Sequence, residues 1–159
     1  MILAAHSDAA YLNETRNRSC AGSYIFCSDN DIIPRDNGPI LSLAQIINVV
    51  MSSASESELA GLFITAKTMV TLRQTLKEIK WPQPRSPIQT EKSTENGFAN
   101  QTIVPKKTNS TDMRFYCLSC QYFQGQFRYY WAPVTTNRAD YHTKRHPPQY
   151  HEAHRPWAS

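Results

Sequence analysis

The chain has 159 residues, 40% of them hydrophobic, and a formal charge of +4 at pH 7. That is enough apolar material for one domain with a core, and no apolar run reaches the roughly 18 residues of a membrane-spanning helix. The mild positive charge is compatible with a polyanionic partner but does not require one.

The first third of the sequence predicts strands joined by short connections. Alternating apolar residues predict strands over 2–12, 21–28 and 40–47, and the stretch from Ser19 to Gly22 predicts the turn between the first two. A turn-rich segment, 29–39, precedes the third strand. Short connections between successive strands indicate an antiparallel meander. His6 and Asp8 follow the apolar opening, so we expect no signal peptide.

The next stretch has the period of an amphipathic helix. Apolar residues recur at helical spacing over 53–80, and Trp81-Pro82 ends the pattern. At its start, Ser55 with Glu58 three residues later fits a capping box, in which the two side chains satisfy free backbone N–H groups. Taken alone, Glu58 is therefore explained by helix capping.

The remainder alternates between helices and strands. In chain order we expect a strand at 86–90, a helical turn at 94–101, a basic loop at 104–110, a helix at 111–123, a strand at 125–134, a terminal helix at 136–144 and an irregular tail rich in proline and histidine from His146. The whole order predicts an α/β fold with a mixed sheet, in which an antiparallel portion is followed by parallel crossovers. We expect one domain over 1–145 and a tail over 146–159.

Four cysteines occur, at positions 20, 27, 117 and 120. Cys117 and Cys120 have the spacing of a metal-binding pair, but Cys20 and Cys27 do not form a second close pair. We expect reduced thiols. A zinc-binding interaction module built on Cys117 and Cys120 is the alternative.

Four acidic residues fall where this arrangement brings them near one another. Asp8 lies in the first strand, Glu58 in the first turns of the long helix, Glu91 at the end of the fourth strand and Asp140 in the terminal helix. If the first and fourth strands are central neighbours, Asp8 and Glu91 lie side by side, within reach of the other two acids. Such a cluster is costly unless a cation neutralises it, and Mg²⁺ prefers oxygen ligands. Two such ions could bracket a phosphodiester.

Each acid also has an ordinary structural explanation. Asp8 could form a turn at the end of a strand, Glu91 could be solvated, and Asp140 could complement the dipole at the start of a helix. The metal-site hypothesis therefore depends on all four residues together.

Six stretches follow one another in this order over nearly the whole chain: HSDAAYL, MSSASESELAGL, IQTEKSTENGFANQ, KKTNSTDMRFY, GQFRYYWAP and TTNRADYHTKRHPP. Together they resemble the ribonuclease H (RNase H) domain of copia-type retrotransposon polyproteins. The resemblance implies an RNase H-like fold with a mixed five-stranded sheet flanked by helices. It also implies endonucleolytic hydrolysis of the RNA strand of RNA–DNA hybrids with two Mg²⁺ ions, for which Mn²⁺ could substitute.

The resemblance assigns roles residue by residue. Asp8 matches the first-strand aspartate and would bridge both ions, and Asp140 matches the aspartate of the final AD-x-x-TK motif and would hold one of them. Glu58 matches the second glutamate of the helix start, with Glu56 as the other choice. Glu58 and Glu91 would share the remaining ion. The family carries TDN where this chain reads TEK at Thr90 to Lys92, so a decayed copy that folds and binds nucleic acid without cleaving it is the alternative.

Basic residues near the second half of the chain suggest contacts to phosphates. Lys106, Lys107 and Arg114 could bind a nucleic-acid backbone, although a solvated loop would explain the lysines equally well. The resemblance implies an RNA–DNA hybrid as substrate, the reverse transcriptase polymerase domain of the parent polyprotein as partner, and no membrane. It further implies a monomer located inside the cell, in a cytoplasmic particle or the nucleus.

Overall fold

The computed structural model describes residues 1–15, 17–91, 97 and 109–152. Its elements are β1 (Ile2–Glu14), β2 (Arg18–Ser28), β3 (Pro39–Ile47), α1 (Ala54–Glu78), β4 (Ser86–Thr90), α3 (Asn109–Phe123), β5 (Phe127–Trp131), the 3-10 helix η1 (Val134–Thr136) and α4 (Asp140–Thr143). The helical turn expected at 94–101 falls almost entirely outside the described residues, as do Lys106 and Lys107. None of the described helices is long and apolar enough to cross a membrane.

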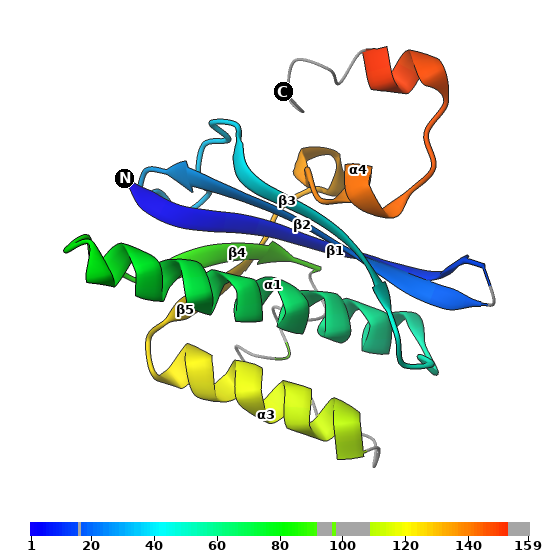
Figure 1. Ribbon diagram of the computed structural model, residues 1–159, viewed down its shortest axis with the longest axis horizontal. Helices are drawn as coiled ribbons and strands as arrows, with labels where there is room; N and C mark the ends of the chain where they lie inside the picture. Colours follow the sequence, from blue (N-terminus) through cyan, green and yellow to red (C-terminus); the bar gives the residue numbers. More distant parts are fainter. Residues whose placement is uncertain (16, 92–96, 98–108, 153–159) are drawn as a thin grey trace.

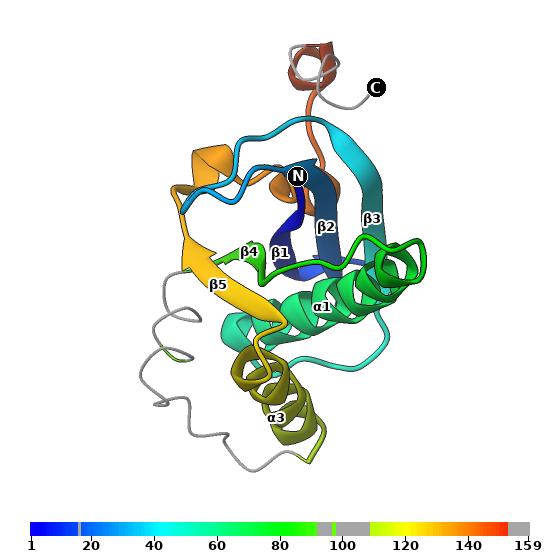
Figure 2. The ribbon, with the colours of Figure 1, turned by 90° about the vertical axis from the view of Figure 1, so that its left-hand side faces the viewer.

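The strands form one five-stranded sheet in the order β3-β2-β1-β4-β5. β1 pairs with β2, and β2 with β3, in antiparallel fashion, whereas the β1–β4 and β4–β5 pairs are parallel. The predicted mixed five-stranded sheet is confirmed. The first and fourth strands pair at its centre, which is the condition under which Asp8 and Glu91 lie side by side. In Figures 1 and 2, α1 and α3 lie on one side of the sheet and α4 lies on the other.

Two sets of side chains pack on the two faces of the sheet. The larger core lies against α1 and α3 and includes Leu3, Ile25, Leu62, Ile88 and Phe127. A smaller cluster on the α4 side joins Ala4, Tyr24, Phe26 and Ala139. Because both faces of the central strands are covered, β4 is buried along its whole length.

The turn predicted from Ser19 to Gly22 is wrong, because β2 already begins at Arg18 and the reversal lies before it, where Asn17 has a φ of 54°. Gly22 is a mid-strand residue. A Cβ atom there would lie 2.6 Å from the carbonyl oxygen of Ala139 and 2.7 Å from Cγ2 of Thr143. The glycine therefore permits close approach of α4 to the sheet and does not form a turn.

The capping box predicted from Ser55 and Glu58 is also wrong. The N-cap of α1 is Ser53, whose hydroxyl accepts a hydrogen bond from the backbone N–H of Glu56 at 3.2 Å. The Glu56 carboxylate in turn accepts from the backbone N–H and the hydroxyl of Ser52, both at 2.7 Å. The capping chemistry lies two residues earlier than expected, and Glu58 takes no part in it.

Two serine variants distinguish these capping assignments. We expect Ser53→Ala to lower the free energy of unfolding by about 1 kcal/mol, because it leaves an N–H group at the helix start without its acceptor. Ser55→Ala, the matched control inside the first turn, should change it far less. Urea denaturation followed by circular dichroism measures both. An equal loss for the two variants would contradict the assignment of Ser53 as the cap.

The C-terminal elements are shorter than the sequence predicts. The strand expected at 125–134 is limited to β5. The helix expected at 136–144 is limited to α4, and the separate 3-10 turn η1 ends at Thr136, where that helix was expected to begin. The break between them occurs at Asn137, which has an extended backbone (φ −81°, ψ 102°) and whose side-chain oxygen accepts from the N–H of Ala139 at 3.0 Å. This local hydrogen bond competes with helix continuation. In the segment expected to be irregular, residues 148–152 are helical.

Candidate active site

The site lies where β1 continues past the end of β4. Pairing between these two strands joins Ala5 with Ile88 and His6 with Gln89, and the same register continued would bring Asp8 opposite Glu91. Asp8 therefore sits on β1 beside the carboxyl end of β4, at the centre of the sheet. Glu58, in the second turn of α1, reaches the same point from the other side of the strand.

A cavity of about 430 Å³ opens at this position. Three of the four predicted acids, Asp8, Glu58 and Glu91, line its wall. Asp140 does not line the cavity, although Lys144, its partner in an ion pair, does. The remaining lining residues are Ala9, Gln89, Thr90, Trp131, Ala132, Val134 and Asn137.

Asp8 is bound by Thr143 of α4, and its buried environment disfavours a charged carboxylate. The hydroxyl of Thr143 donates a hydrogen bond to Oδ2 of Asp8. Burial raises the pKa of Asp8, and the nearby Asp140 carboxylate raises it further, while the Thr143 hydrogen bond and Lys144 act in the opposite direction. Asp8 and Asp140 are therefore close enough to interact electrostatically.

Glu58 is the most strongly perturbed acid. Its side chain is buried, and Oε1 accepts a hydrogen bond from the backbone N–H of Ala9 at 3.2 Å. Burial raises the pKa of Glu58 to about 9, and the carboxylates of Asp8 and Glu91 contribute to the increase. At neutral pH this environment favours a protonated carboxyl, and an adjacent cation would reverse that preference.

Asp140 and Lys144 form an ion pair one helical turn apart. The hydrogen bond to Asp140 raises the pKa of Lys144, and Asp8 and Glu58 add to this effect. The ammonium group of Lys144 is therefore a positive charge that three of the four acids share. Of the two residues that end the ADYHTK stretch, Lys144 pairs with the Asp140 carboxylate, and the Thr143 hydroxyl bonds to the Asp8 carboxylate and to the carbonyl oxygen of Asp140.

Of the three basic residues predicted to contact nucleic acid, the structure describes one, Arg114. Arg114 is half-buried on α3, where Nη1 lies 4.0 Å from Sδ of Met51, and it is not among the residues that line the cavity. Lys106 and Lys107 lie outside the described residues. Glu91 is exposed at the cavity wall.

The four cysteines are free thiols, as expected. Within the described part of the chain, no three His, Cys, Asp or Glu side chains are grouped closely enough to hold one metal ion. The acids thus share a cavity and influence each other's charge without forming a compact ligand cage.

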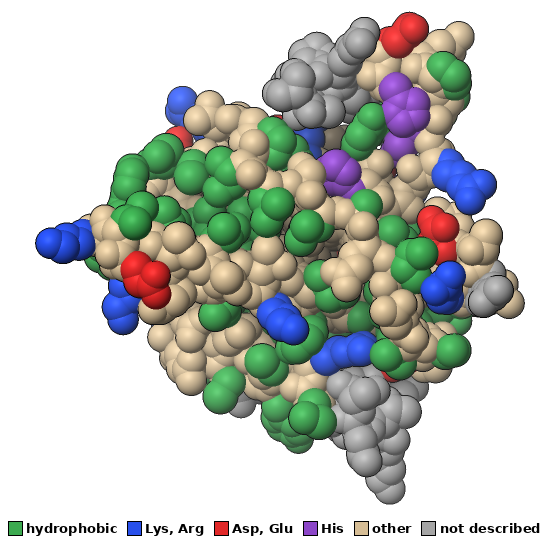
Figure 3. All heavy atoms as spheres, viewed as in Figure 1, with side chains coloured by type: hydrophobic (Ala, Val, Ile, Leu, Met, Phe, Trp, Pro, Cys, Tyr) green, Lys and Arg blue, Asp and Glu red, His purple; other side chains and the backbone are tan. Residues whose placement is uncertain are grey.

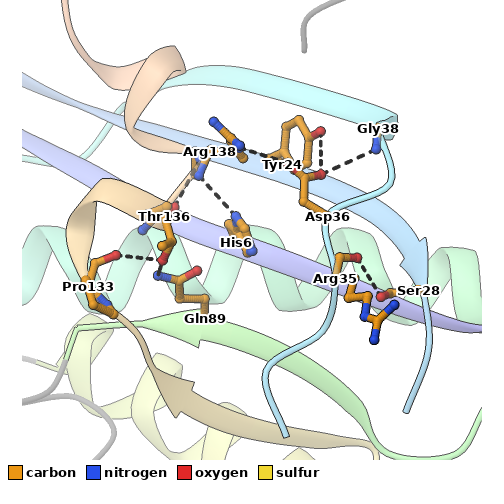
Figure 4. A network of polar contacts seen from close by, with 12 residues as sticks. His6, Tyr24, Ser28, Arg35, Asp36, Gly38, Gln89, Pro133, Thr136 and Arg138 are labelled. Atoms are coloured by element: carbon orange, nitrogen blue, oxygen red, sulfur yellow. Dashed lines mark hydrogen bonds and ion pairs between the residues drawn. The ribbon is translucent and has the colours of Figure 1, made fainter. Parts of the chain in front are cut away.

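Several residues that shape the site carry no clear signal in the sequence. Gln89 and Asn137 line the cavity, and the Asn137 amide donates to the carbonyl oxygen of Ser7 at 2.9 Å. Arg138 joins the segment before α4 to β1 and to Asp36 (Figure 4). Partners about 100 residues or more apart in sequence leave no periodic pattern, and only the TNRAD context around Asp140 could have drawn attention to Asn137 and Arg138.

The buried carboxyl of Glu58 predicts a pH dependence of stability. Its pKa is higher in the folded protein than the ordinary value of 4.5, so the folded state binds more protons between these values and loses stability as pH rises. With chelator present, we expect the free energy of unfolding to fall between pH 6 and 8 by at most about 1.4 kcal/mol per pH unit from this one group.

Glu58→Gln should remove most of this slope and make the protein more stable at pH 8. The matched control is Glu78→Gln, at the exposed far end of the same helix, which should leave the slope as it is. Urea denaturation at several pH values measures both variants. If the pH dependence of stability were unchanged in Glu58→Gln, the pKa of Glu58 would not be raised in the folded protein.

No family model matches the sequence, and neither does any curated protein. Solved structures do match. LC11-RNase H1 in complex with an RNA/DNA hybrid is 12% identical, with a TM-score of 0.59 over 87% of this chain and 91% of that one. The N-terminal RNase H domain of a Mycobacterium tuberculosis protein is 15% identical, with a TM-score of 0.59 and 89% of both chains covered. The protease–reverse transcriptase of Prototype Foamy Virus is 11% identical, with a TM-score of 0.50 over 89% of this chain and 20% of that one. The chain therefore has the RNase H fold.

Proposed function

We propose that this chain is a ribonuclease H of the retrotransposon type, which cleaves the RNA strand of RNA–DNA hybrids endonucleolytically. The observation that carries the proposal is the cavity at the end of β4, where Asp8, Glu58 and Glu91 arrive from three different elements and Asp140 lies close to Asp8. The RNase H fold supports it, and one structural neighbour was solved with an RNA/DNA hybrid. The ordered motifs, ending in ADYHTK, favour the copia type.

We further propose that Asp8, Glu58, Glu91 and Asp140 hold two Mg²⁺ ions, which Mn²⁺ could replace. The chemistry of the donors fits, because all four are carboxylates, the ligands that hard divalent ions prefer. Burial, with a contribution from the carboxylates of Asp8 and Glu91, raises the pKa of Glu58, and a cation at the site would offset this effect. Bound ions of this kind supply an activated water and stabilise the leaving oxygen of the phosphodiester.

The protein's own groups have separate tasks in this scheme. The Thr143 hydroxyl orients the Asp8 carboxylate, and the Ala9 N–H orients that of Glu58. Lys144 offsets the negative charge of Asp140. Trp131 adds an aromatic surface to the cavity wall, and Asn137 fixes the wall in place through the bonds of its amide to Ser7 and Ala139.

The sequence suggests further features that belong to the same proposal. The catalytic domain would comprise residues 1–145, and Lys106, Lys107 and Arg114 would contact phosphates. The polymerase domain of a reverse transcriptase would be its partner, and the foamy virus neighbour is such a protein. We propose that the domain is monomeric and acts inside the cell, in a cytoplasmic particle or the nucleus.

Cleavage of a labelled RNA–DNA hybrid by the purified chain, in Mg²⁺ or Mn²⁺, tests the function. Single-stranded RNA, double-stranded RNA and double-stranded DNA of the same sequence are the controls. We expect internal cuts in the RNA strand of the hybrid alone and none with chelator. Equal cleavage of single-stranded RNA would contradict the proposal.

A second function, hybrid binding without cleavage, is favoured by one observation: position 91 is a glutamate with an exposed side chain, where the resembled family carries aspartate. We expect Glu91→Asp to raise the cleavage rate roughly tenfold, because displacements of about 1 Å at a reacting centre cost up to about a hundredfold. Glu78→Asp, an exposed control on α1, should leave the rate unchanged.

The combination of outcomes separates the two functions. Wild-type cleavage supports the enzyme directly. A silent wild type that recovers activity on Glu91→Asp would identify a decayed catalyst. If Glu91→Asp combined with Lys92→Asn is also silent while the protein folds, the assignment of the catalytic acids is wrong.

A further inference from the structure

The carboxylate of Asp36, in the loop between β2 and β3, joins two separate parts of the fold. Oδ2 accepts from Nε of Arg138 at 2.8 Å, and Oδ1 accepts from the hydroxyl of Tyr24 at 2.8 Å (Figure 4). The side chains of Asp36 and Arg138 are only 16% and 24% exposed. By contrast, the Asp29–Arg35 pair in the same loop is 44% and 84% exposed, with its atoms 3.7 Å apart. The first pair is sheltered from water and the second is not.

Arg138 is also bound to β1, through its backbone. Its N–H donates to Nδ1 of His6 at 3.0 Å, and the His6 ring packs on Tyr24 and Phe26. His6 precedes Asp8 by two residues on β1, and Arg138 precedes Asp140 by two residues. The interactions of Arg138 therefore lie directly beside both acids.

The helix that carries Asp140 cannot hold its own position. α4 spans four residues, and its N-cap, Ala139, provides no side-chain hydrogen bond. An isolated helix of this length is unstable in water. Its placement over β2 must therefore come from surrounding contacts. At its C-terminal end the Thr143 hydroxyl donates to Asp8 and the Asn13 amide donates to the Thr143 carbonyl oxygen, and at its N-terminal end the bonds of Arg138 hold the segment that leads into it.

From this geometry we propose that Asp36 is a positioning residue: it holds Arg138, and through Arg138 it holds α4 so that Asp140 and Thr143 lie against Asp8. The effect on cleavage rests on the proposed function, whereas the effect on α4 does not. In Figure 3, which has the view of Figure 1, histidine side chains (purple) lie in the region where Figure 1 draws α4 and the segment that follows it.

The position of α4 can be followed through a thiol that it covers. Cys20 is 6% exposed, and its Sγ lies 4.0 Å from the carbonyl oxygen of His142. Native-state alkylation, resolved by mass spectrometry, should show Cys20 of Asp36→Asn reacting several-fold faster than in the wild type. Cys117, half-buried on α3 on the other side of the sheet, should be unchanged. In Asp36→Glu, which keeps the carboxylate, Cys20 should react at a rate between those of the wild type and Asp36→Asn. Asp29→Asn, the matched control, should react at the wild-type rate.

The kinetic readouts are kcat, KM and the Mg²⁺ concentration for half-maximal cleavage. In Asp36→Asn we expect kcat to fall roughly tenfold, as for other residues that support metal ligands, and the Mg²⁺ requirement to rise, with KM for the hybrid unchanged. An activity loss that only follows the folded fraction, at an unchanged Mg²⁺ requirement, would overturn the positioning role.

The labelling result decides the remaining cases. An unchanged Cys20 rate would overturn the proposal, because α4 would then be held by other contacts. Equal acceleration of Cys20 and Cys117 would also overturn it, because the whole fold would then have loosened. If the wild type cleaves no hybrid, the proposed function fails, and labelling alone decides whether Asp36 holds α4.

Discussion

Asp8→Asn is expected to reduce hybrid cleavage by at least about a thousandfold. Among the acids that the structure describes, Asp8 interacts with two of the others: Asp140 helps to raise its pKa, and it helps to raise the pKa of Glu58. Losing its charge removes several kcal/mol of stabilisation from a metal-assisted phosphodiester cleavage, and each 1.4 kcal/mol is about a factor of ten in rate. Single-turnover cleavage of a labelled hybrid in Mg²⁺ measures the effect.

The same variant should not damage the fold. Burial raises the pKa of Asp8, so a neutral side chain of the same shape removes an unfavourable charge and retains an acceptor for Thr143. We expect the melting temperature in chelator at pH 8 to rise. Asp29→Asn, which also removes one negative charge, should cleave at the wild-type rate. Residual activity of Asp8→Asn within tenfold of wild type would contradict the central role of Asp8.

Gly22→Ala is expected to displace α4 and to lower cleavage at least tenfold. The added Cβ would lie 2.6 Å from a backbone oxygen, which cannot move aside as a flexible side chain could. Overpacking of this kind costs about 1–3 kcal/mol, even though alanine is favoured over glycine within a strand. Because α4 carries Asp140 and Thr143, the displacement changes the site as well as the stability.

Ala44→Val is the matched control for this glycine. Ala44 is the register partner of Gly22 on β3 and is exposed, so added methyl groups meet solvent there. We expect wild-type activity and stability in Ala44→Val. Urea denaturation and hybrid cleavage distinguish the two variants, and a fully stable, fully active Gly22→Ala would show that α4 does not need its close approach to β2.

Local patterns in the sequence determined the secondary structure well, because strand and helix periods depend on neighbouring residues. They indicated all five strands, the long helix and α3, and the order of elements led to the mixed sheet. Predictions from these patterns were wrong where a residue that fits a local motif has another role in the structure. Gly22 resembles a turn glycine but makes room for α4, and Glu58 resembles a capping residue because the true cap, Ser53 with Glu56, lies two residues away with the same spacing.

For the candidate site, too, the sequence determined one part and the tertiary structure another. The sequence by itself determined which acids could act together, since each stands at a recognisable place in a strand or helix. Only the tertiary structure decided how they meet: three share a cavity, while Asp140 is paired with Lys144 at its edge. It alone also revealed Thr143 against Asp8 and Arg138 between His6 and Asp36. The physical reason is distance along the chain, because contacts between residues about 100 positions or more apart arise from packing and leave no periodic trace in either segment.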